Sequence, residues 1–464
     1  MKFLLFGIGD YYERYKKWFD AEEIVALIDN SKKKQNTKID GISVLSPENG
    51  VKLQYDAIVI LSFYVATMKE QLLNLGISEQ NIFHFYDMNT LLGSKRKDKK
   101  VKFYGGAEFI INNKQENLKK IALLSQELTL GGPSIALYHV AMVLKKKGYE
   151  VVYASMIDGP LREKLISNNI PVVIDENMQV GTMNDIEWLN GFSLIICNTI
   201  NYHIFLTERD ENIPILWWLH DALFFYDGVK RKNLIKIKQK NLKVISVGPI
   251  PRKAIQKFLP NLSVGELLYG VADNFIEKKY KKVLDKMCFV TIGFLENIKG
   301  QDILLKAISL LTDEVKKKIK VLLIGYDATL FAEQLKEQYQ FLNEVQFVGS
   351  VDRQMVHNIL DDADVLICPS RQDSMPTVVA EAMMHSIPCI VSDVIGTVEY
   401  ICNGKNGIIT PNENVDVLAE KIAWCVDHPL EVKRMGMEAR ILYENYFSMK
   451  KFEENLLETI KEFI

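Results

Sequence analysis

Short apolar runs, rich in β-branched residues, recur along this sequence and constrain its fold more than any other feature. Three examples are CFVTIG at 288–293, KVLLIG at 320–325 and VLICPS at 365–370. Runs of this kind are typical of strands that are buried on both faces of a parallel sheet. Stretches with helical spacing separate many of them. The sequence therefore predicts an α/β fold with parallel sheets.

The alternation of strand and helix begins three times, which predicts three Rossmann-like units in tandem. A basic stretch separates the first unit from the second, and the end of the chain is helical and amphipathic. We expect an accessory unit at 1–93, a basic linker at 94–118, a second unit at 119–280, a third unit at 281–440 and a terminal helix at 441–464.

Composition excludes several classes of protein. Lys plus Arg number 57 and Asp plus Glu number 59, so we expect no nucleic acid to be held by bulk charge. No apolar stretch approaches the roughly 20 residues that span a bilayer, and MKFLLFGIGD fits a first strand better than a signal peptide. The six cysteines form no CxxC pair, which favours buried thiols in a reducing cytoplasm over disulfides or zinc.

Two glycine loops follow predicted strands. GIGDYY at 7–12 resembles part of a dinucleotide-binding loop, and Asp29 ends the next strand where a ribose-binding acid belongs. The third glycine position is Tyr12, so a plain tight turn is the favoured interpretation. Gly131 and Gly132 open a helix after another strand, where backbone N–H groups can approach an anion. A simple strand–helix turn is the alternative there.

A histidine and a lysine also follow predicted strands. His220 comes directly after an apolar strand, so it would point into the crevice where open α/β sheets bind ligands. Taken alone, a histidine satisfied in the core is the better interpretation. Lys299 precedes Gly300 and a helix, a place that suits a phosphate oxygen. The alternative is a solvated surface lysine.

The stretch PSRQDSMPTVVAEAMM, from residue 369, contains the densest group of candidate residues. Ser374, Pro376 and Thr377 favour a helix start, whose free N–H groups form a seat for a diphosphate. Glu381 would lie more than a turn deeper, and Asp373 precedes the helix. We interpret the two carboxylates as grips on the two ends of one elongated ligand, with the phosphate between them.

The order of these signals resembles a known family. The glycine pair, the strand-end histidine, the KG loop, PS-x-x-D-x7-E-A-M and the later IP-x-IVSD and NG are similar to the retaining glycosyltransferases of family four, which have the GT-B fold. The resemblance covers about 119–464 and is most specific at 365–410. It implies two facing Rossmann domains, a nucleotide-sugar in the cleft, and a last helix that crosses back to the first of them.

The resemblance also implies roles on the donor side. Glu381 would hold the ribose hydroxyls, and the loop around Val351 would lie against the base. Asp373 would replace the first Glu of the E-x7-E signature, near the transferred sugar, with a side chain one methylene shorter. The backbone of Ser374, Met375, Pro376 and Thr377 would bind the diphosphate.

Two cationic or polar positions complete the implied site. Lys299 would contact the diphosphate, and it would carry more of the charge alone because Phe294 stands where a phosphate-binding Arg is usual. His220 would sit beside the sugar, with Gly131 and Gly132 in the same domain.

The expected activity is retaining transfer of a hexosyl or related sugar from a nucleoside-diphosphate sugar to a hydroxyl of a glycan or lipid-linked acceptor, in cell-surface polysaccharide synthesis. Neither metal nor cofactor is required. Three alternatives stay open: an epimerase that uses the same fold, an inactive sugar-nucleotide sensor, and a nicotinamide oxidoreductase built on GIGDYY.

Two segments lie outside this resemblance or at its edge. Residues 1–93 loosely resemble small nucleotide-sugar-binding domains, and we assign them no ligand. The basic run at 95–102 would either contact anionic lipid at the inner membrane face or remain a solvated linker. We expect a cytoplasmic protein.

Overall fold

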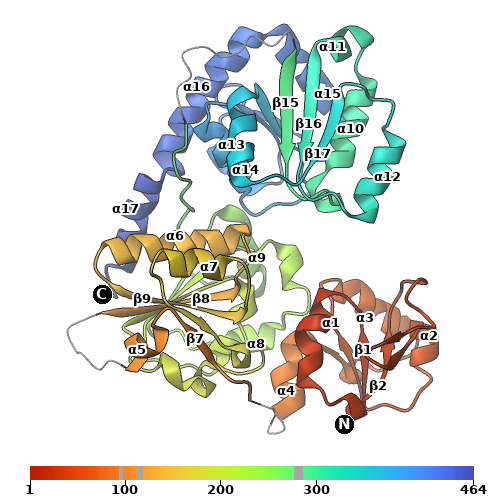
Figure 1. Ribbon diagram of the computed structural model, residues 1–464, viewed down its shortest axis with the longest axis vertical. Coiled ribbons are helices and arrows are strands. Elements are labelled where there is room, and N and C mark those ends of the chain that lie inside the picture. The colour runs from red at the N-terminus through yellow and green to blue at the C-terminus, as the bar shows by residue number, and fades with distance from the viewer. Residues whose placement is uncertain (94–97, 113–118, 276–285, 464) are drawn as a thin grey trace.

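The computed structural model describes residues 1–93, 98–112, 119–275 and 286–463, and it has three sheets, each dominated by parallel strands (Figure 1). The first sheet has the order β3-β4-β2-β1-β5-β6. Its strands are β1 (Phe3–Phe6), β2 (Ile24–Ile28), β3 (Lys38–Ile39), β4 (Ile42–Leu45), β5 (Ala57–Ile60) and β6 (Ile82–His84). Only β3 is antiparallel to its neighbour. The predicted α/β class is therefore confirmed.

The second sheet has the order β14-β13-β12-β11-β8-β9-β10-β7, and β7 alone is antiparallel. Its strands are β7 (Lys102–Tyr104), β8 (Lys120–Glu127), β9 (Glu150–Ile157), β10 (Val172–Ile174), β11 (Leu194–Asn198), β12 (Ile215–Leu219), β13 (Leu242–Ser246) and β14 (Val264–Glu266). Helix α6 (Gly132–Lys146) packs on β8 and β9. Residues 102–112, expected in a linker, instead add β7 and α5 (Ala107–Asn112) to this unit, because β7 finds an open edge at β10.

The third sheet is parallel throughout, in the order β17-β16-β15-β18-β19-β20. Its strands are β15 (Met287–Ile292), β16 (Ile319–Ile324), β17 (Val345–Gly349), β18 (Val365–Cys368), β19 (Cys389–Ser392) and β20 (Ile408–Thr410). Helices α10 (Gln301–Leu310), α12 (Leu330–Gln338), α13 (Arg353–Asp362), α14 (Thr377–Met384) and α15 (Val415–Asp427) surround it. Every residue of β18 and β19 is buried, as expected for strands covered on both faces.

The chain that follows β14 lies beside the last helices at the junction of the second and third units. Helices α16 (Pro429–Tyr446) and α17 (Met449–Ile460) run from the third unit to the second (Figure 1). The N–H of Val271 donates to the carbonyl of Phe447 at 2.8 Å, and the Tyr443 hydroxyl donates to the Val271 carbonyl at 2.9 Å. Phe452 of α17 stacks on Trp218 of β12, with ring centroids 6.1 Å apart.

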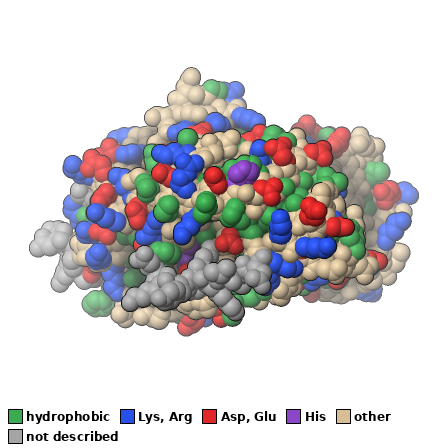
Figure 2. Space-filling model, turned by 90° about the horizontal axis from the view of Figure 1, so that it is seen from above, with side chains coloured by type: hydrophobic (Ala, Val, Ile, Leu, Met, Phe, Trp, Pro, Cys, Tyr) green, Lys and Arg blue, Asp and Glu red, His purple; other side chains and the backbone are tan. Residues whose placement is uncertain are grey.

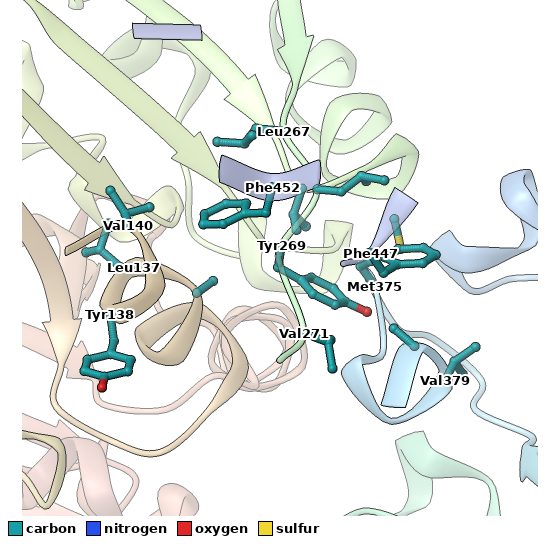
Figure 3. Packing of buried hydrophobic residues seen from close by; sticks show 14 of the residues in the cluster. Leu137, Tyr138, Val140, Leu267, Tyr269, Val271, Met375, Val379, Phe447 and Phe452 are labelled. Carbon is teal, nitrogen blue, oxygen red and sulfur yellow. The ribbon is translucent and has the colours of Figure 1, made fainter. Parts of the chain in front are cut away.

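The apolar core continues across this junction. Figure 3 shows Phe452 and Tyr269 in one cluster with Phe447, Met375 and Val379, so side chains of the second unit, of α14 and of the last helices share their packing. The surface is of mixed charge: on the face seen in Figure 2, Lys and Arg are interspersed with Asp and Glu. Among the described residues, no helix is both long and apolar enough to cross a membrane.

The first sheet docks on the second unit through polar contacts as well as aromatic ones. The Lys230 ammonium lies 2.7 and 2.8 Å from the two oxygens of Asp87, and Arg14 pairs with Glu127 at 2.7 Å. Lys99, from the basic run, donates through its ammonium to the Lys17 carbonyl at 3.0 Å. Residues 95–97 of that run lie outside the described part of the chain, and Lys99 binds protein rather than extending outward.

Candidate functional site

A cleft of about 350 Å³ lies between the second and third units. The second unit contributes Gly132, which opens α6, and His220, which follows β12. The third unit contributes Lys299, after β15, and the segment 372–378, after β18. All four stretches follow the carboxyl ends of parallel strands, which is where open α/β sheets bind ligands.

Lys299 and Asp373 form an ion pair inside this cleft. The Lys299 ammonium lies 2.7 Å from a carboxylate oxygen of Asp373, although 74 residues separate them in sequence. Gly300 permits the turn, because its φ of +70° favours glycine and an added Cβ would collide with the Pro369 carbonyl. Burial on its own lowers the pKa of Lys299, but the Asp373 carboxylate outweighs it and the pKa lies above its ordinary value. Lys299 is therefore a protonated cation at neutral pH.

The segment that carries the predicted phosphate seat turns directly into α14. The helix begins at Thr377, and Pro376 is its N-cap. Pro376 has no N–H, so a phosphate seat at this place would use the amides of Ser374, Met375 and Thr377 rather than all four predicted residues. A backbone hydrogen bond fixes the start of this segment, because the Gly396 N–H donates to the Asp373 carbonyl at 3.1 Å.

Two more contacts fix the same segment. The Tyr269 hydroxyl donates to the Pro376 carbonyl at 3.1 Å, and the Met375 side chain packs in the core shown in Figure 3. The chain before α14 is thus fixed to both units at once, which preorganises its N–H groups.

Glu381 and Val351 do not line this cleft. Glu381 is 2% exposed, one turn into α14, and its carboxylate pairs with Arg353 at the start of α13. Val351, in the loop before α13, packs partly buried against the same core as α14. Arg353 escaped the sequence analysis because only the packing of α13 on α14 brings it to Glu381. Glu381 and Arg353 thus form an ion pair outside the set of residues that line the cleft, and Val351 and Gly131 also lie outside that set.

His220 is buried at the wall of the cleft. Burial lowers its pKa to about 3, and the Nε2 atom has no hydrogen-bond partner among the described residues. The adjacent Asp221 accepts a hydrogen bond from the Ile200 N–H at 2.6 Å. Burial raises the pKa of Asp221 to about 7. His220 is therefore a neutral, buried side chain at the cleft wall, and its Nε2 atom is unsatisfied among the described residues.

Because Phe294 stands where a phosphate-binding Arg is usual, Lys299 is the one cation among the described residues that line the cleft. The Phe294 ring is 63% exposed and lies beside Tyr326, with centroids 5.9 Å apart. Arg371 is near in sequence to the phosphate seat, but its guanidinium binds Asp302 and Glu413. Among the described residues that line the cleft, Lys299 is the only Lys or Arg. In the same described part of the chain, no three His, Cys, Asp or Glu side chains converge as a metal site.

The low pKa of His220 predicts a pH effect on stability. Below about pH 6.5 the unfolded chain binds a proton at this histidine, whereas the folded protein excludes it until about pH 3. The contribution of His220 to the free energy of unfolding therefore falls as pH drops through this window, by roughly 2 kcal/mol between pH 6.5 and 5. His220→Gln should lose less stability than the wild type between these pH values in urea titrations. Equal losses would contradict the burial of a neutral imidazole.

Two facing parallel sheets with one cleft at their carboxyl ends define a GT-B type fold. The sequence comparisons agree with it. Residues 273–441 match the model described as glycosyl transferases group 1, residues 117–247 match glycosyl-transferase family 4, and residues 1–83 match the model described as C2185-like, N-terminal.

Individual relatives point the same way. Spore coat protein SA of Bacillus subtilis is 24% identical over 73% of this chain and 98% of its own length. The capsular polysaccharide biosynthesis glycosyltransferase CapM of Staphylococcus aureus is 24% identical over 40% of this chain and 50% of its own length. The crystal structure of Anabaena HepE in complex with UDP and glucose aligns at a TM-score of 0.63, with 18% identity, over 74% of this chain and all of the other. The chain is a glycosyltransferase of GT-B fold.

Proposed function

We propose that this enzyme transfers a hexosyl or related sugar from a nucleoside-diphosphate sugar to a hydroxyl of a glycan or lipid-linked acceptor, with retention of the anomeric configuration. One observation supports the proposal: the protonated Lys299 and the segment 374–377, which leads into α14, line the same cleft. Anionic leaving groups are stabilised by such fixed donors. We place the reaction in the cytoplasm and in the synthesis of cell-surface polysaccharide.

The proposed step breaks the bond between the anomeric carbon and the phosphate oxygen, and the electron pair leaves with the diphosphate. Lys299 and the N–H groups of Ser374, Met375 and Thr377 stabilise that growing charge. The acceptor oxygen bonds to the anomeric carbon on the same face, and its proton passes to the departing phosphate. Asp373, displaced from Lys299 by the diphosphate, faces the sugar, and His220 hydrogen-bonds a sugar hydroxyl through Nε2.

A uridine diphosphate sugar is the first donor to test, because the aligned Anabaena HepE structures are complexes with UDP and glucose and with UDP-glucose. The experiment follows the anomeric proton of a panel of nucleotide sugars by NMR, with and without a mixture of glycan acceptors. We expect slow hydrolysis without acceptor and a product with the donor's configuration. A donor epimerised without acceptor would indicate an epimerase instead, and a donor left unchanged throughout would indicate an inactive sensor.

Glu381 is proposed to hold the ribose, so Glu381→Gln should weaken nucleoside-diphosphate binding about tenfold. The loss follows from removing a charged acceptor of hydrogen bonds, a change of about 1.4 kcal/mol, at the low end for hydrogen bonds to charged groups. Isothermal calorimetry with UDP and GDP measures it, and Glu337→Gln on the exposed face of α12 is the matched control. Unchanged affinity in the Glu381 variant would remove Glu381 from the nucleotide site.

A further inference from the structure

A second hollow, the N-terminal pocket, opens at the carboxyl ends of the first sheet. It has a volume of about 550 Å³ and is lined by the loops that follow β1, β2 and β5. Strand order reverses at β1, with β2 on one side and β5 on the other, so the loops part there. The polar side chains that line it are those of Asp10, Tyr11, Arg14, Asp29, Asn30, Lys34, Ser62, Tyr64 and Thr67.

Tyr11, at the wall of this pocket, carries a hydroxyl group without a hydrogen-bond partner among the described residues. Its ring is buried against Phe63 and Phe85, at centroid distances of 4.5 Å each. Its hydroxyl is buried as well. Buried polar groups normally find partners, so this hydroxyl has unused hydrogen-bonding capacity beside the pocket.

The N-terminal pocket and the cleft share one aromatic wall. Phe63 and Tyr64 line the pocket, and Phe224 and Phe225 line the cleft. Phe63 lies 5.5 Å from Phe225 and 6.4 Å from Phe224, and Tyr64 lies 6.2 Å from Phe224, measured between ring centroids. Tyr64 is 66% exposed. Large exposed aromatic groups at a hollow of this kind are typical of a binding surface.

The first sheet also fixes the turn that carries Phe224 and Phe225. That turn is the 3-10 helix Leu223–Tyr226, and Gly228 follows it. His84, at the end of β6, packs over Gly228 so closely that an added Cβ would lie 2.8 Å from Nδ1. The ion pair between Lys230 of the second unit and Asp87 of the first lies at the same junction. The aromatic wall is therefore held in place by both units.

We propose that this surface binds the glycan chain of the acceptor, an inference that rests on the proposed function. The third unit holds the donor, so the acceptor must enter on the side of His220 and Phe224. Its reacting sugar lies in the cleft, and the sugars behind it run along Phe224 and Tyr64 into the N-terminal pocket. Sugar rings present apolar C–H faces that cover aromatic rings, and their hydroxyls meet polar side chains of the pocket lining such as Asn30 and Lys34.

The experiment measures glycan binding separately from catalysis. Labelled full-length protein is applied to an array of bacterial capsule and lipopolysaccharide oligosaccharides of about one to six sugars. We expect the wild type to retain chains of about three sugars or more, Tyr64→Ala to lose about tenfold in affinity, and Leu53→Ala, an exposed apolar position of the same unit, to match the wild type. Donor hydrolysis should persist in Tyr64→Ala.

Three results would overturn the inference. One is that the wild type retains no glycan while it still turns over the donor, which leaves the proposed function intact. Another is a glycan affinity that Tyr64→Ala does not change. The last is a second equivalent of UDP bound in calorimetry and lost in Lys34→Ala, which would make the pocket a nucleotide site. Absence of donor turnover in the wild type counts against the proposed function alone.

Discussion

Lys299→Ala should lower kcat/KM for sugar transfer by about 10²-fold or more. Removing one fixed donor aimed at developing negative charge costs about 2.7–4 kcal/mol of transition-state stabilisation in comparable sites. Here the loss is aggravated because Asp373 would then face the diphosphate without its partner, 2.7 Å from where the ammonium lay. Lys299 is 31% exposed, so the melting temperature should change little. Initial rates and thermal melts of the purified variant measure both.

The matched control is Lys336→Ala, which removes a lysine that pairs with Asp327 at 2.6 Å outside the cleft. The double variant Lys299→Ala with Asp373→Asn should bind nucleoside diphosphates more tightly than Lys299→Ala, because the uncompensated carboxylate is gone. Turnover like that of the wild type in Lys299→Ala would remove this residue from the mechanism.

Phe452→Ala should lower the free energy of unfolding of the second unit by about 3–5 kcal/mol, the usual cost of a buried Phe lost from a core. Phe452 is buried between Trp218 and the backbone at Gly270, so α17 cannot collapse into the space. Thermal melts should show the transition at a lower temperature. Donor binding at the third unit should survive at temperatures below that transition.

Leu430→Ala is the control for this variant, because Leu430 lies in the first turn of α16 but is 78% exposed, so its loss should cost less than about 0.5 kcal/mol. A Phe452→Ala protein that melts with the wild type would mean that α17 is only loosely attached to the second unit.

Much of the fold followed from strand periodicity, because strands buried on both faces leave an unmistakable apolar run. The same logic brought His220, Lys299 and Asp373 together: each follows a strand, and carboxyl ends of parallel strands meet at one edge. Spacing could not show that Lys299 and Asp373 pair, since two loops 74 residues apart must first be packed.

Other features depended on contacts that no local pattern encodes. Glu381 was expected beside the ligand, yet the direction of its side chain is decided by Arg353 on a neighbouring helix. Phe224 and Phe225 look like core residues in sequence, and only the docking of the first sheet reveals them as a wall between two hollows. The extra strand β7 formed because an unpaired sheet edge was available.

The two chain crossings between the lobes have a mechanical consequence. Val271 on the way out and Phe447 on the way back are hydrogen-bonded to each other, and Arg440 pairs with Asp273 just beyond. Any rotation of the third unit relative to the second would therefore bend the chain at both of these crossings. Met375 packs in one apolar cluster with Phe447, next to these crossings, so such a rotation would displace its loop less than the distant rim of the cleft.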